Sequence, residues 1–179
     1  FKKISKANIK LAGLNILVGA NGSGKSSILQ AIHLASCLMR QAVALRSDGT
    51  SAISVNELDY LPSDDYSELG HNQRWGNQTG TPSSKVKFDF TDGDDVINSW
   101  CEIRSARNAG ISIKGDAPSK SLRLFRGTEK FFSAYIPGIS GIPNKEEKRS
   151  KRVVLKACSF GDSNVYLRNA LILLSDNEI

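Results

Sequence analysis

The sequence predicts an α/β fold in which a strand, a glycine-rich loop and a helix are followed by an antiparallel β-subdomain. Three observations lead to this prediction. Leu14 to Val18 form an almost unbroken apolar run, as expected of a strand buried on both faces. After the glycine-rich loop, apolar residues from Ile28 to Met39 recur at helical spacing. From Lys85 the apolar period changes to two, which is typical of antiparallel strands.

Composition is that of a single globular domain. The 179 residues are 40% hydrophobic and 23% charged, which excludes collagen-like, low-complexity and wholly disordered classes. The three cysteines are far apart and form no C-x-x-C motif, so neither a disulfide framework nor a zinc site is indicated. No apolar run approaches the roughly 20 residues of a membrane span. We therefore expect a cytoplasmic protein with no membrane contact.

Residues 1–46 are expected to hold the strand, the loop and the first helix. Residues 1–12 predict a short strand pair, because isolated aliphatic residues stand among lysines. The run Leu14 to Val18 follows as the buried strand. The helix after the loop is expected to reach about Leu45, where Ser47-Asp48-Gly49 stops it.

The remaining chain divides into three segments. Residues 47–84 are rich in Ser, Asp, Asn, Gly and Pro, which predicts a long polar loop or a partly helical insertion. Residues 85–136 predict antiparallel strands, with strands after the first at Trp100 to Arg104, Ile111 to Lys114, Leu122 to Phe125 and Phe131 to Ile136. Residues 144–179 predict a basic helical segment with helices at about Lys145 to Lys156 and Asn164 to Leu174. The chain starts without Met and ends after a helical pattern with no stop signal, so we expect a missing C-terminal part.

Charge is distributed unevenly. Residues 1–47 hold seven Lys or Arg and no acid, and residues 48–100 hold three bases and ten acids. Residues 101–179 hold fourteen bases and eight acids. An acid-free N-terminal part suits a polyanion, either a nucleotide phosphate or a nucleic acid, while a solvated basic strand is the alternative.

The glycine-rich loop matches the pattern G-x-x-x-x-G-K-[ST] in full, with Gly19, Gly24, Lys25 and Ser26 at the fixed positions. Gly22 and Gly24 permit backbone conformations that let successive N–H groups turn toward phosphates. The helix that follows adds its positive N-terminal end. The alternative, a turn that caps a helix by chance, is disfavoured because the spacing, the Lys, the Ser and both flanks agree.

The loop motif assigns chemistry to single residues. Lys25 is expected to reach the β- and γ-phosphate oxygens, and the Ser26 hydroxyl is expected to be a Mg²⁺ ligand. The expected cofactors are therefore ATP and Mg²⁺. The residues expected to bind them are Asn21, Gly22, Ser23, Gly24, Lys25, Ser26 and Ser27.

The run ILVGANGSGKSSILQAI, from Ile16 to Ile32, resembles the N-terminal lobe of ABC-type ATPases of the structural-maintenance-of-chromosomes (SMC), RecF and overcoming-lysogenization-defect (OLD) group. Phe1-Lys2-Lys3 is similar to the opening of that lobe. The resemblance implies a P-loop NTPase fold with an antiparallel β-subdomain. Tyr135 to Pro143, with the basic helix after it, resembles ATPases of prokaryotic anti-phage systems such as Septu.

The resemblance also implies partners and a reaction. Two such heads would enclose two ATP molecules, so the expected partners are the chain's own C-terminal lobe and a second copy in a homodimer or higher oligomer. ATP binding and hydrolysis would then control DNA or an associated nuclease effector, in DNA repair or anti-phage defence. A small-molecule or nucleotide kinase, and an ATP-dependent oligomeric scaffold with little turnover, are the alternatives.

Several motifs of the group are not evident in the sequence: the Walker B strand, the signature and the switch histidine. Leu171 to Glu178 superficially resembles an apolar strand ending in acids, but its apolar residues continue a helical stripe. In this group a glutamine on a loop after the first helix contacts Mg²⁺ and the attacking water. Gln73 is the tentative catalytic candidate, with Gln78 as a second, and a solvated loop glutamine is the alternative for both.

Three further features have both a functional and a structural interpretation. His33 lies within the first helix, where a packed residue is favoured over a metal ligand. Asp64 and Asp65 are better explained by a turn than by paired catalytic carboxylates. The densest basic cluster follows residue 144. Its helical spacing would place four cations on one face that follows a nucleic-acid backbone, or that contacts an acidic partner or solvent: Lys145, Lys148, Arg149 and Arg152.

Overall fold

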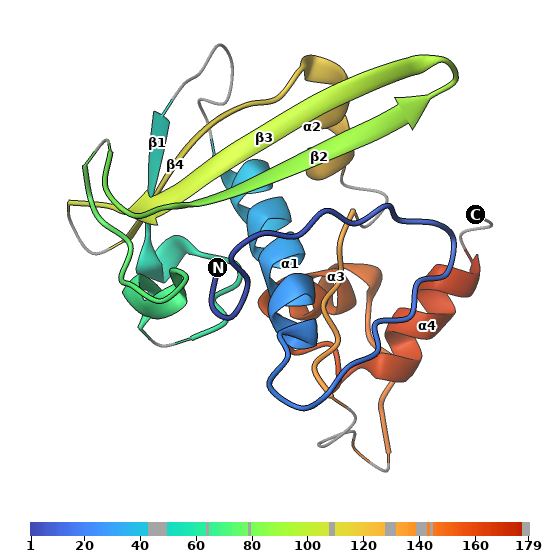
Figure 1. Cartoon of the computed structure of the whole chain (residues 1–179). Coiled ribbons are helices and arrows are strands. Elements are labelled where there is room, and N and C mark those ends of the chain that lie inside the picture. The colour runs from blue at the N-terminus through green and yellow to red at the C-terminus, as the bar shows by residue number, and fades with distance from the viewer. Residues whose placement is uncertain are drawn as a thin grey trace.

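Four strands form one antiparallel sheet in the order β1-β4-β3-β2 (Figure 1). The computed structural model describes residues 1–42, 50–63, 65–78, 80–107, 110–127, 132–138, 143 and 145–176. The strands are β1 (Thr50–Ser54), β2 (Ser84–Asp92), β3 (Asp95–Ser105) and β4 (Gly110–Asp116). The β-subdomain predicted from the two-residue period is therefore present. It gains β1 from a segment that the sequence analysis assigned to a polar loop or a partly helical insertion.

The hairpin of β2 and β3 is the longest feature of the sheet and extends across the top of the molecule in Figure 1. Gly93 begins its turn with φ +64, a left-handed conformation that favours glycine. Alternate residues of β3 are buried, including Ser99, Cys101 and Ile103. This alternation places one face of the sheet against the helices and leaves the other face to solvent.

Two helices cover the buried face of the sheet. Helix α1 (Lys25–Gln41) packs on α2 (Ser119–Arg126), and both contact β3. Leu34, Leu38 and Met39 of α1 are fully buried in the main core. The structure thus confirms the helix predicted after the glycine-rich loop. Its predicted end at Leu45 lies outside the described residues.

The strand predicted at Leu122 to Phe125 is wrong, because these residues lie in α2. Ser121, Leu122 and Phe125 are its buried residues, and their spacing is that of one helical face. A four-residue apolar segment is too short for its period to distinguish a strand from a helix. The strand predicted at Phe131 to Ile136 is also wrong over residues 132–136, which have no regular structure. Phe132 instead packs its ring 4.5 Å from that of Phe125.

The basic segment contains a shorter helix than predicted. Helix α3 (Lys151–Phe160) starts after residues 145–150, which are not helical, so the expected helix from Lys145 to Lys156 is corrected to its second half. Helix α4 (Leu167–Asp176) continues the predicted helix and includes Leu171 to Leu174, so the strand-like reading of that run is excluded. Val154, Cys158 and Ala170 form a small second core between α3 and α4.

The N-terminal segment differs most from the prediction. Residues 1–24 contain no strand, and the expected strand pair at 1–12 and buried strand at 14–18 are absent. Leu14, Ile16 and Val18 are 82%, 77% and 90% exposed. A strand buried on both faces needs a neighbour to bond its backbone groups, and the described residues supply no such neighbour here. Figure 1 shows this segment passing in front of α4 before it turns back into α1.

Two classes of feature are not found in the part of the chain that the structure describes. No helix there has the length and apolar character needed to cross a bilayer. No group of three or more His, Cys, Asp or Glu side chains there is arranged to hold a metal ion.

Candidate nucleotide-binding site

The phosphate loop lies exposed at the N-terminal end of α1. Gly24 is the N-cap residue with φ +96, and Gly22 has φ +78, so both occupy the left-handed region that side chains disfavour. The Lys25 side chain curls back over the loop, and its Nζ donates to the Gly19 carbonyl at 2.6 Å and the Ala20 carbonyl at 2.8 Å. A Cβ on Gly19 would lie 2.8 Å from the Ser23 hydroxyl oxygen, so a larger residue there would require the Ser23 side chain to move.

The loop's local charge suits a phosphate group. Helix α1 has 17 residues and no acidic residue in its first turn, so its positive N-terminal end is not neutralised by its own side chains. The partners of Lys25 are neutral carbonyl oxygens, which phosphate oxygens can replace with charged acceptors. Asn21, Ser23 and Ser26 are exposed beside them. The residues present therefore fit a nucleotide triphosphate with Mg²⁺.

A cleft of about 480 Å³ adjoins the start of α1. Ser27 lines it from the helix, and Lys2, Lys3, Gln73 and Arg74 line it from segments far apart in the sequence. Of the two candidate glutamines, Gln73 is thus the one placed at this cleft. Neither lysine nor Arg74 was predicted to line a cleft, although the acid-free N-terminal segment was a signal for the lysines.

Long-range hydrogen bonds build the cleft. The Lys2 amide donates to the Leu69 carbonyl at 2.7 Å, and His71 Nδ1 donates to the Lys2 carbonyl at 2.8 Å. Lys2 Nζ donates to Gln30 Oε1 of α1 at 2.9 Å. Partial burial lowers the pKa of Lys2 from its ordinary value. These bonds fix the N-terminus against both α1 and the segment that carries Gln73.

The predicted basic face does not form. Lys145, Lys148 and Arg149 precede α3, and only Arg152 lies within it. Arg149 pairs with Glu147 at 2.7 Å, and its amide donates to the Asn169 side chain at 2.9 Å. All four predicted cations are exposed, but they do not share one helical face. The prediction from helical spacing was wrong because it assumed a helix from Lys145, six residues before α3 begins at Lys151.

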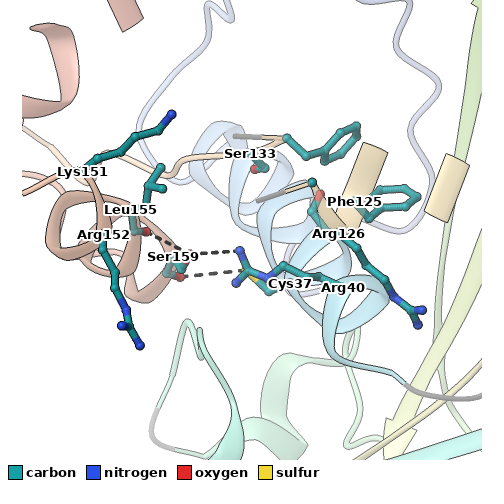
Figure 2. Close-up of a pocket in the computed structure, with 12 residues that line it drawn as sticks. Cys37, Arg40, Phe125, Arg126, Ser133, Lys151, Arg152, Leu155 and Ser159 are labelled. Atoms are coloured by element: carbon teal, nitrogen blue, oxygen red, sulfur yellow. Dashed lines mark hydrogen bonds between the residues drawn. The ribbon is translucent and has the colours of Figure 1, made fainter. Parts of the chain in front are cut away.

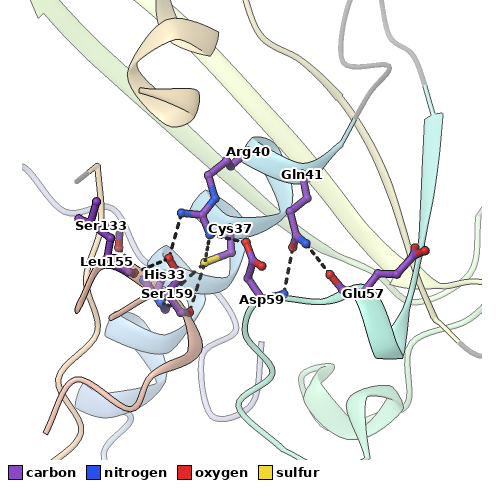
Figure 3. Close-up of polar contacts among 9 residues, drawn as sticks. All are labelled: His33, Cys37, Arg40, Gln41, Glu57, Asp59, Ser133, Leu155 and Ser159. Carbon is purple, nitrogen blue, oxygen red and sulfur yellow. Dashed lines mark hydrogen bonds and ion pairs between the residues drawn. The ribbon is translucent and has the colours of Figure 1, made fainter. Parts of the chain in front are cut away.

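His33 holds α1 in place and is a packed residue, as the sequence favoured. It is 1% exposed, and its Nε2 donates to the Ser159 carbonyl of α3 at 3.1 Å. Figure 3 shows Cys37 and Arg40 of α1 directed at the same residue, and Arg40 also forms an ion pair with Asp59. The helix that carries the phosphate loop is therefore fastened to α3 through Ser159.

Asp65, one of the two adjacent carboxylates of the sequence analysis, has a structural role. Asp65 accepts hydrogen bonds from the Ser67 amide at 3.0 Å and the Ser67 hydroxyl at 2.6 Å, which lower the pKa of this carboxyl group. This matches the turn interpretation, and Asp64 lies outside the described residues.

Burial raises the pKa of the thiols to about 12 for Cys37 and Cys101 and about 11 for Cys158. None of the three is a ready nucleophile at neutral pH.

Comparison with known proteins places these features in a family. A family model described as an AAA domain matches residues 1–154. The DNA double-strand break repair Rad50 ATPase of Archaeoglobus fulgidus is 30% identical over 103 residues, which cover 57% of this chain and 11% of that protein. The DNA replication and repair protein RecF of Edwardsiella ictaluri is 27% identical over 148 residues, covering 75% of this chain and 40% of that protein.

A second RecF, from Vibrio parahaemolyticus, is 40% identical over 62 residues, which cover 34% of this chain and 16% of that protein. The chain thus spans less than half the length of each of these relatives. No solved structure matches this chain significantly.

Proposed function

Because the chain belongs to the AAA domain family, we propose that it forms the N-terminal ATP-binding lobe of an SMC/RecF-type ATPase. The observation that carries the proposal is the phosphate loop. The ammonium group of the half-buried Lys25 lies over loop carbonyls at the start of a helix whose first turn has no acidic residue, where a bound triphosphate would be most stabilised. The similarity to Rad50 and RecF supports the same group.

In this proposal each loop residue has a task. The backbone N–H groups of residues 21–27 bind the phosphates, and Lys25 exchanges its two carbonyl partners for β- and γ-phosphate oxygens. The exposed Ser26 hydroxyl is a ligand of Mg²⁺, which when bound offsets the negative charge of the phosphates. Gln73 is the candidate for positioning the attacking water, because it lines the same cleft as Ser27.

A C-terminal lobe and a second copy complete the proposed enzyme. Residues 14–18 support this, because their apolar side chains are exposed and no strand pairs with them in the described part of the chain. Parallel strands with such composition are usually buried within a sheet. We infer that strands of the C-terminal lobe cover this segment. Hydrolysis then needs groups supplied by that lobe and by the second head.

DNA is the proposed ligand of the complete ATPase, and DNA repair is the proposed setting. The similarity to Rad50 and RecF, which are described as DNA repair proteins, supports this choice. The exposed cations Lys145, Lys148, Arg149 and Arg152 are the proposed contacts, as separate phosphate contacts along an extended segment. A nuclease effector and an anti-phage setting are the second candidate. They rest on the resemblance of residues 135–143, of which 139–142 lie outside the described residues.

Calorimetry with Mg²⁺ and ATP tests the binding proposal. Lys25→Ala removes two charge-assisted contacts, each worth about 1.5–3 kcal/mol, so affinity should fall by roughly a hundredfold or more. The fold should persist, because Lys25 contacts only loop carbonyls. Lys10→Ala, which removes another exposed cation of the same segment, is the matched control and should bind as the parent does. Equal affinity of Lys25→Ala and the parent would refute the assignment.

Phosphate release, measured together with the oligomeric state in solution, distinguishes an ATPase from an ATP-dependent scaffold and from a kinase. We expect residues 1–179 alone to hydrolyse ATP no faster than the Lys25→Ala variant, and the complete protein to hydrolyse ATP as a dimer or higher oligomer. ATP-dependent oligomerisation of the complete protein without turnover would favour the scaffold. Transfer of phosphate to an added small molecule would favour the kinase. Lys25-dependent turnover by the monomeric chain would contradict the need for a second lobe.

A further inference from the structure

A second cavity, of about 560 Å³, lies beside the C-terminal half of α1. Its walls come from α1, α2, α3 and residues 132–133 (Figure 2). Ser36, one of the lining residues, follows Lys25 by eleven positions, which places it about 16 Å along the helix from the phosphate loop. The cavity is thus separate from the proposed nucleotide site.

The interior of the cavity is apolar. Phe125, Phe132 and Leu155 line it, and Phe125 and Phe132 belong to an aromatic cluster with rings of β2. The three serine hydroxyls among the described lining residues donate within the protein. Ser36 donates to the Ile32 carbonyl at 2.7 Å, Ser159 donates to the Leu155 carbonyl at 3.1 Å, and Ser133 bonds to His33 at 2.8 Å. An entering apolar group therefore displaces no polar contact.

The mouth of the cavity is cationic. Arg126, Lys151 and Arg152 line it, and none of the lining residues that the structure describes is acidic. In the described part of the chain, no carboxylate forms an ion pair with any of these three, whereas the fourth lining cation, Arg40, pairs with Asp59. Figure 2 shows the charged ends of Arg126, Lys151 and Arg152 directed away from one another. The guanidinium of Arg126 reaches the end of α1 and donates to the Ala42 carbonyl. They form a rim and do not converge on one point.

We propose that this cavity binds an acidic peptide segment of a partner protein, which inserts one bulky apolar side chain and sets carboxylates against the rim. A compact polyphosphate needs cations that converge, and these diverge. A nucleic-acid base read in the cavity needs free hydrogen-bond donors, and the protons of the three serine hydroxyls described there are already donated within the protein. An apolar anchor surrounded by complementary charge is the arrangement that peptide-binding surfaces use. The volume lies in the range typical of ligand pockets.

Calorimetry with a short synthetic peptide tests the proposal. The probe has Trp at its centre and Asp and Glu on both sides, and it is titrated into the purified protein. Replacing Lys151 and Arg152 together by Ala should weaken binding roughly 2- to 30-fold, because each removes one exposed ion pair. Both side chains are exposed, so the variant should fold. Lys87→Ala combined with Arg107→Ala, which loses the same charge from exposed sites elsewhere, should bind as the parent does.

Changes to the peptide and a competitor complete the test. Replacing the central Trp by Ala should weaken binding by about 30-fold or more, as expected of an anchor residue. Replacing Asp and Glu by Asn and Gln should weaken it as much as the rim variant does. Undiminished binding of either altered peptide would overturn the proposal. So would failure of the acidic peptide to bind while a single-stranded oligonucleotide binds in a Lys151- and Arg152-dependent manner.

Discussion

Replacement of His33 by Leu should strongly destabilise the protein, because both ring nitrogens of this buried residue are used. Nε2 lies 3.1 Å from the Ser159 carbonyl, which can only accept, so Nε2 carries the proton. Nδ1 of the neutral ring then accepts from the Ser133 hydroxyl at 2.8 Å. Leu fills a similar volume but makes neither bond.

The expected cost follows from these two contacts. Each buried polar group left without its partner costs about 1–3 kcal/mol, and the Ser159 carbonyl retains only a weak contact from the Cys37 thiol at 3.9 Å. Ser133 is half-buried, so water offsets part of its loss. We expect a decrease of about 2–4 kcal/mol in the free energy of unfolding, which corresponds to roughly 5–15 °C in Tm for a chain of this size.

Urea unfolding followed by circular dichroism measures this decrease. His71→Leu is the matched control, because His71 is the other histidine but is half exposed and bonds a carbonyl near the surface. It should cost less than about 1 kcal/mol, since water can replace the lost bond. A His33→Leu variant no less stable than His71→Leu would refute the role of His33 in fastening α1 to α3.

Two further predictions concern pH and nucleic acid. Burial lowers the pKa of His33 below the value of about 6.5 that it has in the unfolded chain, so its contribution to stability is complete above that pH and is lost as pH falls toward the folded-state pKa. Unfolding measured from pH 8 to pH 5 should show this decline in the parent and a smaller one in His33→Leu; equal slopes would contradict it. Replacing Lys148, Arg149 and Arg152 by Ala should weaken duplex DNA binding regardless of sequence. It should lower the slope of log affinity against log salt by up to about three, and an unchanged slope would exclude phosphate contacts.

Sequence periodicity correctly predicted the elements whose apolar pattern is long enough to distinguish a helical period from a strand period. The alternation Val86, Phe88, Phe90 correctly placed β2, because one face of that strand packs on helices and the other does not. The glycine loop correctly placed the start of α1, since Gly24 permits the turn that begins it. Short segments failed: Leu122 to Phe125 holds too few residues to distinguish the two periods.

Long-range contacts account for what the sequence could not predict. The cleft beside the phosphate loop depends on Lys2 meeting Leu69 and His71, contacts that no local pattern encodes. The run at 14–18 has the composition of a buried strand, but composition does not provide the neighbouring strand that would bury it. The basic residues before α3 have helical spacing, yet Glu146 and Glu147 bond to Asn169 and hold that stretch irregular.

The position of the Lys25 side chain lowers the conformational cost of binding an anion at the loop. Its ammonium group is already anchored by Gly19 and Ala20, so a flexible four-carbon chain need not be immobilised when an anion arrives. Ordering such a side chain usually costs about 0.5–1.5 kcal/mol. The arriving oxygens must instead compete with two carbonyls already in contact. Binding of an anion therefore exchanges the two carbonyl acceptors of Lys25 for phosphate oxygens, and the ammonium group is already in position at the loop.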